Sequence, residues 1–254
     1  MSRLIIAVPG RLASSRFPDK LLIDVFDKPV LHHTLVGVKS YSPLFFDSLE
    51  VIFFGQDKQL CDLAANVGVS AILVEGDFVC GSERVAQGLA TQQVHEELGF
   101  ASHVIVVQGD EPLIESELLM RIEREVFRKR NVGKCFCNLM SAVNPAETFD
   151  ENVVKFDGHK FYRKWGQEDV FSDTGNLASH KKVLGVYGSS ISDFIDWFLK
   201  PRSKLEENLS VEQQRILDNL GSIIPVDSPS DLIGVNTPDD LEKVRCFLKE
   251  GGGV

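Results

Sequence analysis

A loop with three cationic side chains follows the first apolar stretch of the chain. The apolar run, residues 4–8, is short and rich in branched side chains, which is typical of a strand buried on both faces. At the carboxyl end of a parallel strand, cations and hydroxyls lie where α/β sheets bind ligands, and they suit a triphosphate. A solvated basic loop explains the same composition, and the segment is neither a P-loop nor a G-x-G-x-x-G loop. The loop, residues 9–20 (PGRLASSRFPDK), carries Arg11, Ser14, Ser15, Arg16 and Lys20.

An acidic pair follows another apolar run, residues 104–107. The segment QGDEP, residues 108–112, places Asp110 and Glu111 directly after this run. Because the carboxyl ends of parallel strands share one sheet edge, we expect Asp110 near the basic loop. A carboxylate that faces phosphates needs a cation between them, and Mg²⁺ takes carboxylate and phosphate oxygens together. The pattern predicts a magnesium site, although capping of a helix that begins near residue 114 explains the pair equally well.

A third polar segment, CGSER at residues 80–84, stands at the start of an expected helix. Its backbone N–H groups and the Ser82 hydroxyl are suited to hydrogen bonding with the polar edge of a base. Taken alone, an ordinary helix cap explains these residues better.

Strands and helices must alternate to bring these three segments together. The first half of the chain predicts strands at residues 51–54, 71–74 and 104–107, after the first strand. The expected helices are at residues 29–38, 57–66, 83–98 and 115–129. This β-α order predicts a mainly parallel, doubly wound sheet.

The second half has shorter strand candidates separated by polar turns. Strands are expected at residues 134–141, 153–156, 160–164, 183–187 and 223–226, with a hairpin turn at 157–158 and a loop at 165–182. Helices are expected at residues 191–199, 209–220 and 237–249.

Composition restricts the classes of partner. The net charge of −10 argues against nonspecific binding to nucleic acid or to an anionic membrane surface. The chain contains no apolar run of about 18 residues that would span a membrane. The five cysteines form no C-x-x-C pair, and the apolar run at residues 4–8 is too short for a signal peptide. We therefore expect a cytoplasmic protein with reduced thiols.

Together these segments resemble the 3-deoxy-manno-octulosonate cytidylyltransferases (CMP-Kdo synthetases). The basic loop resembles the family pattern A-R-x-x-S-x-R-x-P-x-K, and residues 80–84 resemble its S-G-T-E-R stretch. The run VVQGDEPLI is almost the family signature. Further segments follow in family order, so that the resemblance covers about residues 4–248: residues 152–155, 184–188, 204–206, 212–215 and 234–242.

The resemblance implies a fold and a reaction. The fold is an α/β, Rossmann-like nucleotidyltransferase fold with a mainly parallel sheet, formed by a single domain, residues 1–254. Within it, residues 134–220 form a smaller, β-rich region for sugar binding and dimerisation of a homodimer. The anomeric hydroxyl of an eight-carbon sugar acid attacks the α-phosphorus of CTP, and pyrophosphate leaves.

The resemblance also assigns residue roles. The catalytic residues are Arg11, Lys20 and Asp110. The Mg²⁺ ligands are Asp110 and Asn236. The sugar acid contacts Gln108, Tyr187, Glu212 and Gln213. The nucleotide is held by Arg11, Ser15, Arg16, Lys20, Ser82, Arg84 and Gln108.

The departures from the family pattern gather on the sugar side. Asn236 stands where the family has a metal-binding aspartate, which should weaken that metal site or make it share a neighbouring carboxylate. Val183 replaces a histidine (with His180 nearby), Leu209 replaces a sugar-contacting glutamate, and residues 161–165 replace the family's Y-F-S-R segment. Gly55 and Gln56 stand where the family has T-D.

These changes lead to the hypothesis of an altered acceptor, an 8-amino derivative of Kdo. Its ammonium group could be accepted by Glu168, Asp169 and Asp173, although a solvated loop explains these three acids as well. Unmodified Kdo, another sialic-like acid, and a catalytically silent homologue that binds nucleotide are the alternatives.

Overall fold

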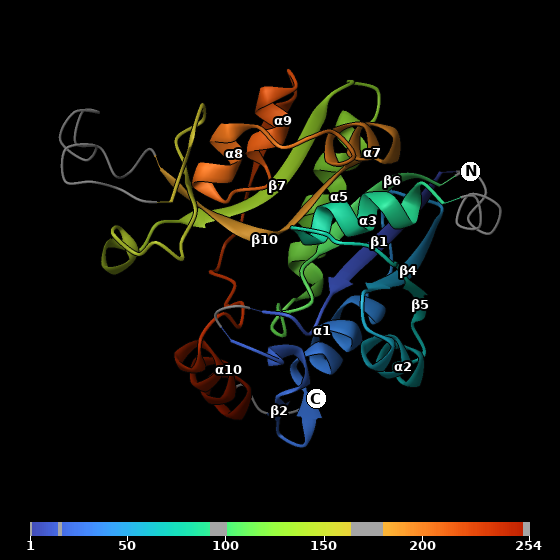
Figure 1. Cartoon of the computed structure of the whole chain (residues 1–254), viewed down its shortest axis with the longest axis vertical. Coiled ribbons are helices and arrows are strands. Elements are labelled where there is room, and N and C mark those ends of the chain that lie inside the picture. The colour runs from blue at the N-terminus through green and yellow to red at the C-terminus, as the bar shows by residue number, and fades with distance from the viewer. Residues whose placement is uncertain (1, 15–16, 92–100, 164–179, 251–254) are drawn as a thin grey trace.

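A computed structural model of the chain describes residues 2–14, 17–91, 101–163 and 180–250. In this part of the chain, one large sheet has the strand order β11-β7-β10-β6-β1-β4-β5 (Figure 1). The pairs β1–β4, β1–β6, β4–β5 and β7–β11 are parallel, whereas β10 is antiparallel to both of its neighbours. The prediction of an α/β fold with a mainly parallel sheet is therefore confirmed. The strands are β1 (Arg3–Gly10), β4 (Ser48–Gly55), β5 (Ser70–Leu73), β6 (Ala101–Val107), β7 (Cys135–Ala142), β10 (Lys181–Ser190) and β11 (Ser222–Asp227).

Two layers of helices cover the two faces of this sheet (Figure 1). Side chains of β1 alternate between them: Leu4 and Ile6 join the core beneath one layer, and Ile5 and Ala7 join the other. All four are completely buried, as expected for a central strand. The first layer contains α1 (Val30–Lys39), α2 (Lys58–Val67), α5 (Ser116–Lys129) and α10 (Pro238–Glu250), and the second contains α3 (Gly81–Leu89), α7 (Ile191–Phe198) and α9 (Gln214–Asp218).

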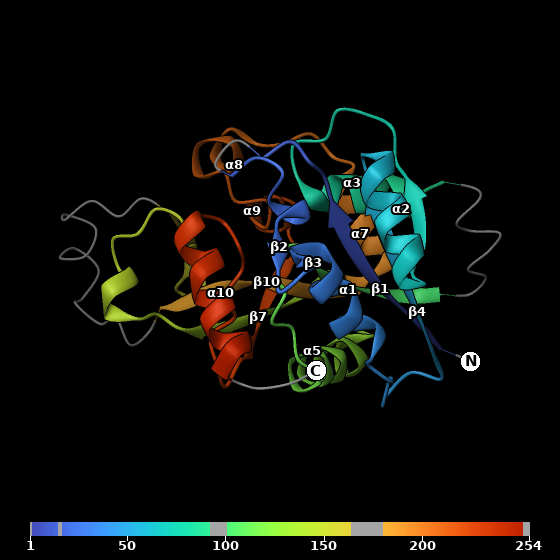
Figure 2. The same ribbon diagram turned by 90° about the horizontal axis from the view of Figure 1, so that it is seen from below.

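The short elements lie mostly at the edges of the sheet. The segment of residues 143–163, yellow-green to yellow in Figures 1 and 2, projects beyond the ends of β7 and β10. It contains η2 (Pro145–Glu147) and the hairpin of β8 (Lys155–Phe156) and β9 (Phe161–Tyr162). The predicted turn at residues 157–158 is confirmed, and Gly158 has a φ of 102°. The remaining elements are η1 (Lys20–Leu22), β2 (Asp24–Val25), β3 (Lys28–Pro29) and α8 (Lys204–Leu209).

Some predicted boundaries are wrong. The helix expected at residues 209–220 is much shorter, because Leu209 is the last residue of α8 and α9 covers only Gln214–Asp218. Ser210 ends α8 with a left-handed φ of 51°, which a continuous helix does not allow. Lys181 and Lys182 belong to β10 rather than to a loop. The helix expected at residues 83–98 is too long, because α3 ends at Leu89 with Ala90 as its C-cap. Residues 92–98 of that expected helix and residues 165–179 of the expected loop fall outside the described residues.

The region at residues 134–220 shares its core with the rest of the molecule. It supplies β7 and β10 to the central sheet, and its α7 packs with α3 over the same face. Its assignment to sugar binding and dimerisation stays a prediction.

An irregular stretch of β10 shapes the sheet edge where ligands are expected. Its pairing with β7 shifts register between Val183 and Tyr187. The buried amide of Asn138 donates to the carbonyls of Leu184 and Val186, at 3.0 and 3.1 Å. The intervening Gly185 carbonyl accepts a hydrogen bond from the Gln108 backbone. These bonds replace the lost ladder bonds, because a buried carbonyl without a partner is costly.

We expect Asn138→Ala to lower the free energy of unfolding by about 3 kcal/mol, because it leaves two buried carbonyls without a donor. Urea unfolding measures the change. The control is Asn131→Ala. Because Asn131 is exposed, this substitution should change the free energy of unfolding by less than about 0.5 kcal/mol. Equal effects of the two substitutions would contradict a structural role for Asn138.

Candidate active site

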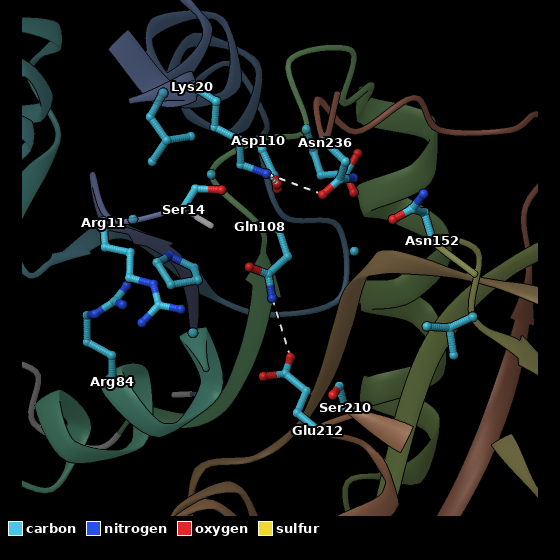
Figure 3. A pocket seen from close by; sticks show the side chains of 18 of the residues that line it. Arg11, Ser14, Lys20, Arg84, Gln108, Asp110, Asn152, Ser210, Glu212 and Asn236 are labelled. Carbon is cyan, nitrogen blue, oxygen red and sulfur yellow. Dashed lines mark hydrogen bonds and ion pairs between the residues drawn. The ribbon is translucent and has the colours of Figure 1, made fainter. Parts of the chain in front are cut away.

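A cavity of about 410 Å³ opens at the carboxyl ends of β1 and β6 (Figure 3). The structure brings most of the predicted site residues to its wall. Ser82 and Tyr187 are buried, with exposed fractions of 0% and 1%, behind this wall. Ser15 and Arg16 lie outside the described residues, so their predicted roles stay predictions. The predicted residues that line the cavity are Arg11, Lys20, Arg84, Gln108, Asp110, Glu212, Gln213 and Asn236.

Two guanidinium groups lie together on one side of the cavity (Figure 3). Arg11 reaches across from the end of β1 and donates to the carbonyls of Phe78 and Val79, at 2.7 and 3.3 Å. Arg84, on α3, is almost completely buried and donates to Gln56 Oε1 at 3.2 Å. Burial and the charge of Arg11 lower the pKa of Arg84 to about 10. Two cations held close together with little water favour an anion between or beside them.

Gln56 is a residue that the sequence analysis did not assign to the site. It extends from the loop after β4, and its own amide is held by the carbonyl of Gly76 at 2.8 Å. Its side-chain oxygen is thereby fixed toward Arg84, whose Nε has no partner among the described residues. In the sequence, only the difference from the family pattern at positions 55 and 56 pointed to Gln56.

On the side of the cavity opposite Arg11 and Arg84, an ammonium group lies between two side chains that carry oxygen atoms (Figure 3). Lys20, in η1, forms an ion pair with Asp110 and donates to Asn236 Oδ1 at 3.3 Å. The backbone N–H of Val235 donates to the Asp110 carbonyl at 2.8 Å, which joins the loop after β6 to the loop before α10. The prediction that Asp110 lies close to the basic loop is confirmed by this contact. The alternative, that the acidic pair caps the following helix, is wrong because α5 begins at Ser116 with Glu115 as its N-cap.

Glu111 points into the protein next to Asp110. It is 7% exposed, and its Oε2 has no hydrogen-bond partner in the described part of the chain. Gly185 and Gly234 lie against its carboxyl group, and a Cβ at Gly185 would overlap Oε1. Burial, followed by the charge of Asp110, raises the pKa of Glu111 to about 8. The Glu111 carboxyl group, whose Oε2 has no hydrogen-bond partner among the described residues, therefore lies next to the Lys20–Asp110 pair.

The wall between the two sides is a hydrogen-bonded network around the Tyr187 hydroxyl. This hydroxyl donates to Glu212 Oε1 at 2.6 Å and accepts from the Gln108 amide at 2.8 Å. It also lies 2.7 Å from the Ser82 hydroxyl. Ser82 is therefore bound to Tyr187 rather than acting as the cap of α3, whose N-cap residue is Cys80. The network fixes the direction of Gln108 and Glu212, which face the cavity.

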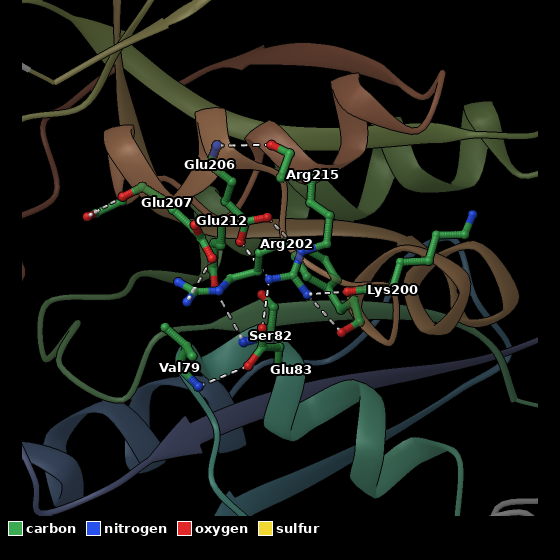
Figure 4. A network of polar contacts seen from close by, with 12 residues as sticks. Val79, Ser82, Glu83, Lys200, Arg202, Glu206, Glu207, Glu212 and Arg215 are labelled. Atoms are coloured by element: carbon green, nitrogen blue, oxygen red, sulfur yellow. Dashed lines mark hydrogen bonds and ion pairs between the residues drawn. The ribbon is translucent and has the colours of Figure 1, made fainter.

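A buried arginine, Arg215, ties the segment that contains Glu212 to the start of α3 (Figure 4). Arg215 is 1% exposed and forms ion pairs with Glu206 of α8 and Glu83 of α3, at 2.6 and 2.7 Å. Burial alone would lower the pKa of Arg215, but hydrogen bonds to Glu206 and Glu83 raise it. Arg215 thus ties the α8–α9 segment, which contains Glu212, to the start of α3. No local signal in the sequence predicts this role of Arg215, because its partners lie 9 and 132 positions away.

Gln213 has a contact of its own. Its amide donates to Asn138 Oδ1 at 3.4 Å, so it links the cavity wall to the irregular stretch of β10. Gln108, Glu212 and Gln213 thus line one wall while Tyr187 supports it from behind. Their predicted contacts with a sugar acid are not tested by this arrangement and stay predictions.

Comparisons with known proteins agree with this geometry. A family model described as "Cytidylyltransferase" matches residues 5–219. The 3-deoxy-manno-octulosonate cytidylyltransferase of Coxiella burnetii (strain RSA 493 / Nine Mile phase I) is 30% identical, over 96% of this chain and 98% of the relative. The chain belongs to the 3-deoxy-manno-octulosonate cytidylyltransferase family.

Two further comparisons extend this result. The cytidylyltransferase of the same name from Zea mays is 27% identical, over 98% of this chain and 82% of the relative. The solved structure of CMP:2-keto-3-deoxy-manno-octonic acid synthetase complexed with CTP has a TM-score of 0.80 at 24% identity, over 98% of this chain and 100% of that one. This cytidylyltransferase therefore has the expected fold and is a nucleotidyltransferase.

The oxygen donors of the cytidylyltransferase fit a hard divalent cation. Asp110 and Asn236 direct oxygens at one cation, the ammonium of Lys20. No group of three His, Cys, Asp or Glu side chains suited to a metal ion occurs among the described residues. Mg²⁺ commonly binds through one or two protein oxygens together with substrate phosphates and water, so two donors are sufficient.

We expect the cytidylyltransferase to lose stability as the pH rises from 4.5 to 8, because of Glu111. Below pH 4.5, its usual pKa, the carboxyl group is protonated in the folded and unfolded chain alike. Between pH 4.5 and its folded pKa of about 8, only the unfolded chain ionises, which favours unfolding. The loss is at most about 1.4 kcal/mol per pH unit and amounts to about 4 kcal/mol over the whole interval, because the slope falls off near both pKa values.

Urea unfolding at pH 5 and pH 8.5 measures this loss. Glu111→Gln should reduce it, whereas Glu117→Gln, a half-exposed carboxylate on α5, should leave it unchanged. The same loss in wild type and in Glu111→Gln would contradict the assignment.

Proposed function

We propose that this cytidylyltransferase transfers CMP from CTP to the anomeric hydroxyl of a 3-deoxy-manno-octulosonate-type sugar acid. The hydroxyl oxygen forms a bond to the α-phosphorus, the bond from that phosphorus to the β-phosphate oxygen breaks, and pyrophosphate leaves with the electron pair. The hydroxyl proton passes to water. The observation that carries the proposal is one cavity with the Arg11–Arg84 pair on one side and Asp110 with Asn236 on the other.

In this proposal the cations bind the triphosphate. Arg11 and Lys20 neutralise phosphate charge, and the buried Arg84, next to Arg11, strengthens the positive potential. In this proposal the base is read at the start of α3, where Ser82 is buried against Tyr187, and the relative solved with CTP supports CTP as the nucleotide. Mg²⁺, held by Asp110 and Asn236, would supply charge neutralisation at the phosphates. Catalysis is mainly positioning and electrostatic stabilisation, because the transfer needs no protein nucleophile.

We further propose that the acceptor carries an amino group, as in the 8-amino derivative of Kdo. A second cavity of about 580 Å³ adjoins the first and shares Glu111, Gly185 and Asn236 with it. Two of its carboxylate oxygens, Glu111 Oε2 and Glu147 Oε2, are buried without a partner among the described residues. An ammonium group supplies the donors that such oxygens lack. The acids that line this cavity are Glu111, Glu147, Asp150, Asp231, Asp239 and Asp240, against Lys182 and Lys243.

The earlier candidates for this ammonium group, Glu168, Asp169 and Asp173, lie outside the described residues and stay predictions. A homodimer and a cytoplasmic location also stay predictions. Among the described helices, none has both the length and the apolar character that crossing a membrane requires.

A catalytically silent, nucleotide-binding homologue is the second candidate function. Asn236 favours it, because a carboxamide contributes no negative charge to a metal site. The charged residues of the nucleotide side argue against it, since Arg11, Lys20, Arg84 and Asp110 all line one cavity. Calorimetry that detects Mg²⁺-dependent CTP binding without pyrophosphate release would favour the silent homologue.

We expect pyrophosphate release when the protein is incubated with CTP, Mg²⁺ and a Kdo-type sugar acid. Arg11→Gln should lower kcat/KM about 100-fold or more, because it removes a cation that binds developing phosphate charge. The matched control, Arg121→Gln, removes an arginine paired with Glu117 on α5 and should leave kcat/KM unchanged. The thermal midpoint of Arg11→Gln should remain close to that of wild type. The enzyme proposal fails if no sugar acid supports release.

We expect higher kcat/KM with 8-amino-Kdo than with Kdo. Glu147→Gln should reduce this preference about tenfold, because one lost charged hydrogen bond corresponds to about 1.4 kcal/mol. The control Asp196→Asn removes a half-exposed carboxylate from α7 and should preserve the preference. Turnover of plain Kdo with equal or higher efficiency would exclude the amino acceptor while leaving the cytidylyltransferase reaction intact.

A further inference from the structure

The Lys20 ammonium lies between the two side-chain oxygens that are proposed to bind the metal ion. Its ammonium forms an ion pair with Asp110 and a hydrogen bond of 3.3 Å with Asn236 Oδ1. The side chains of Lys20 and Asp110 are only 13% and 19% exposed, so water competes little for this contact. One oxygen from the loop after β6 and one from the loop before α10 thus converge on the ammonium.

We propose that Lys20 is a place-holder for the divalent cation. In the nucleotide-free protein its ammonium occupies the position between Asp110 and Asn236, and it leaves that position for the phosphates when the nucleotide binds. This inference rests on the proposed function, because it takes CTP and Mg²⁺ as the ligands.

The charges around Lys20 explain why the exchange depends on the nucleotide. Asp110 contributes one negative charge and Asn236 none, so one ammonium balances the pair. A divalent ion in place of the ammonium leaves an excess positive charge, which a triphosphate neutralises.

The geometry allows Lys20 to change partners without a change of fold. Lys20 lines the same cavity as Arg11 and Arg84. Its long side chain has four rotatable bonds and three donors, so rotation can redirect the ammonium from a carboxylate to a phosphate. Asp110 keeps its backbone bond from Val235 during such a rotation, and the two oxygens stay together.

The test measures Mn²⁺ binding to the nucleotide-free protein from the electron paramagnetic resonance signal of free Mn²⁺. Lys20→Met should bind Mn²⁺ at least tenfold more tightly than wild type, because it removes the competing ammonium. Adding Asp110→Asn to Lys20→Met should abolish this gain. The control Lys243→Met removes a lysine that pairs with Asp240 near the same loop and should change the affinity less than twofold.

The place-holder role is overturned if folded Lys20→Met binds Mn²⁺ no more tightly than wild type. It is also overturned if the gain persists in the double variant, since the metal would then bind elsewhere. Circular dichroism and the thermal midpoint report folding, and Lys20→Gln serves in the same comparison if Lys20→Met does not fold. The measurement uses neither CTP nor a sugar acid, so a failure of the proposed reaction would be seen separately, in the pyrophosphate assay.

Discussion

The hydrogen bonds from Asn138 to the irregular stretch of β10 are the interaction on which the site geometry depends. Strand β10 runs antiparallel between β6 and β7, and its register shift moves Gly185 toward the end of β6. There the Gly185 carbonyl accepts from Gln108, and its lack of a side chain leaves room for Glu111. Both cavities share this stretch of β10. A regular ladder at this position would close the space in which the nucleotide and acceptor sides meet.

The site keeps like charges together on each of its sides. Arg11 lowers the pKa of the buried Arg84, after the larger effect of burial, and Asp110 in the same way adds to the raised pKa of Glu111. Both arrangements are unfavourable in the isolated protein and become favourable when ligands of opposite charge bind. Anionic phosphates suit the arginine side and cations suit the carboxylate side. In the proposed reaction, these charges would orient a metal-bound triphosphate across the cavity.

The sequence predicted the sheet and much of the site because those signals are local. The runs at residues 4–8 and 104–107 form central strands, and the loops after them meet through Lys20 and Asp110. Other features depend on contacts between distant segments. Arg215 has a partner 132 positions away, and the role of Asn138 appears only once β10 has shifted register. The helix expected at residues 209–220 was too long, because Ser210 has a left-handed backbone and ends α8 within an apolar pattern that propensity alone would continue.

Two of the positions that depart from the family pattern line cavities of the structure. Val183 lines both the active-site cavity and the acidic cavity, whereas Leu209 lines a third cavity beside Glu212. His180 does not restore the histidine that Val183 replaces, because it is buried with its ring against Tyr162. An apolar residue at position 183 leaves recognition there to the surrounding carboxylates. A neutral hydroxyl gains less from those carboxylates than an ammonium does, so the proposed preference for an amino acceptor depends on the acidic cavity.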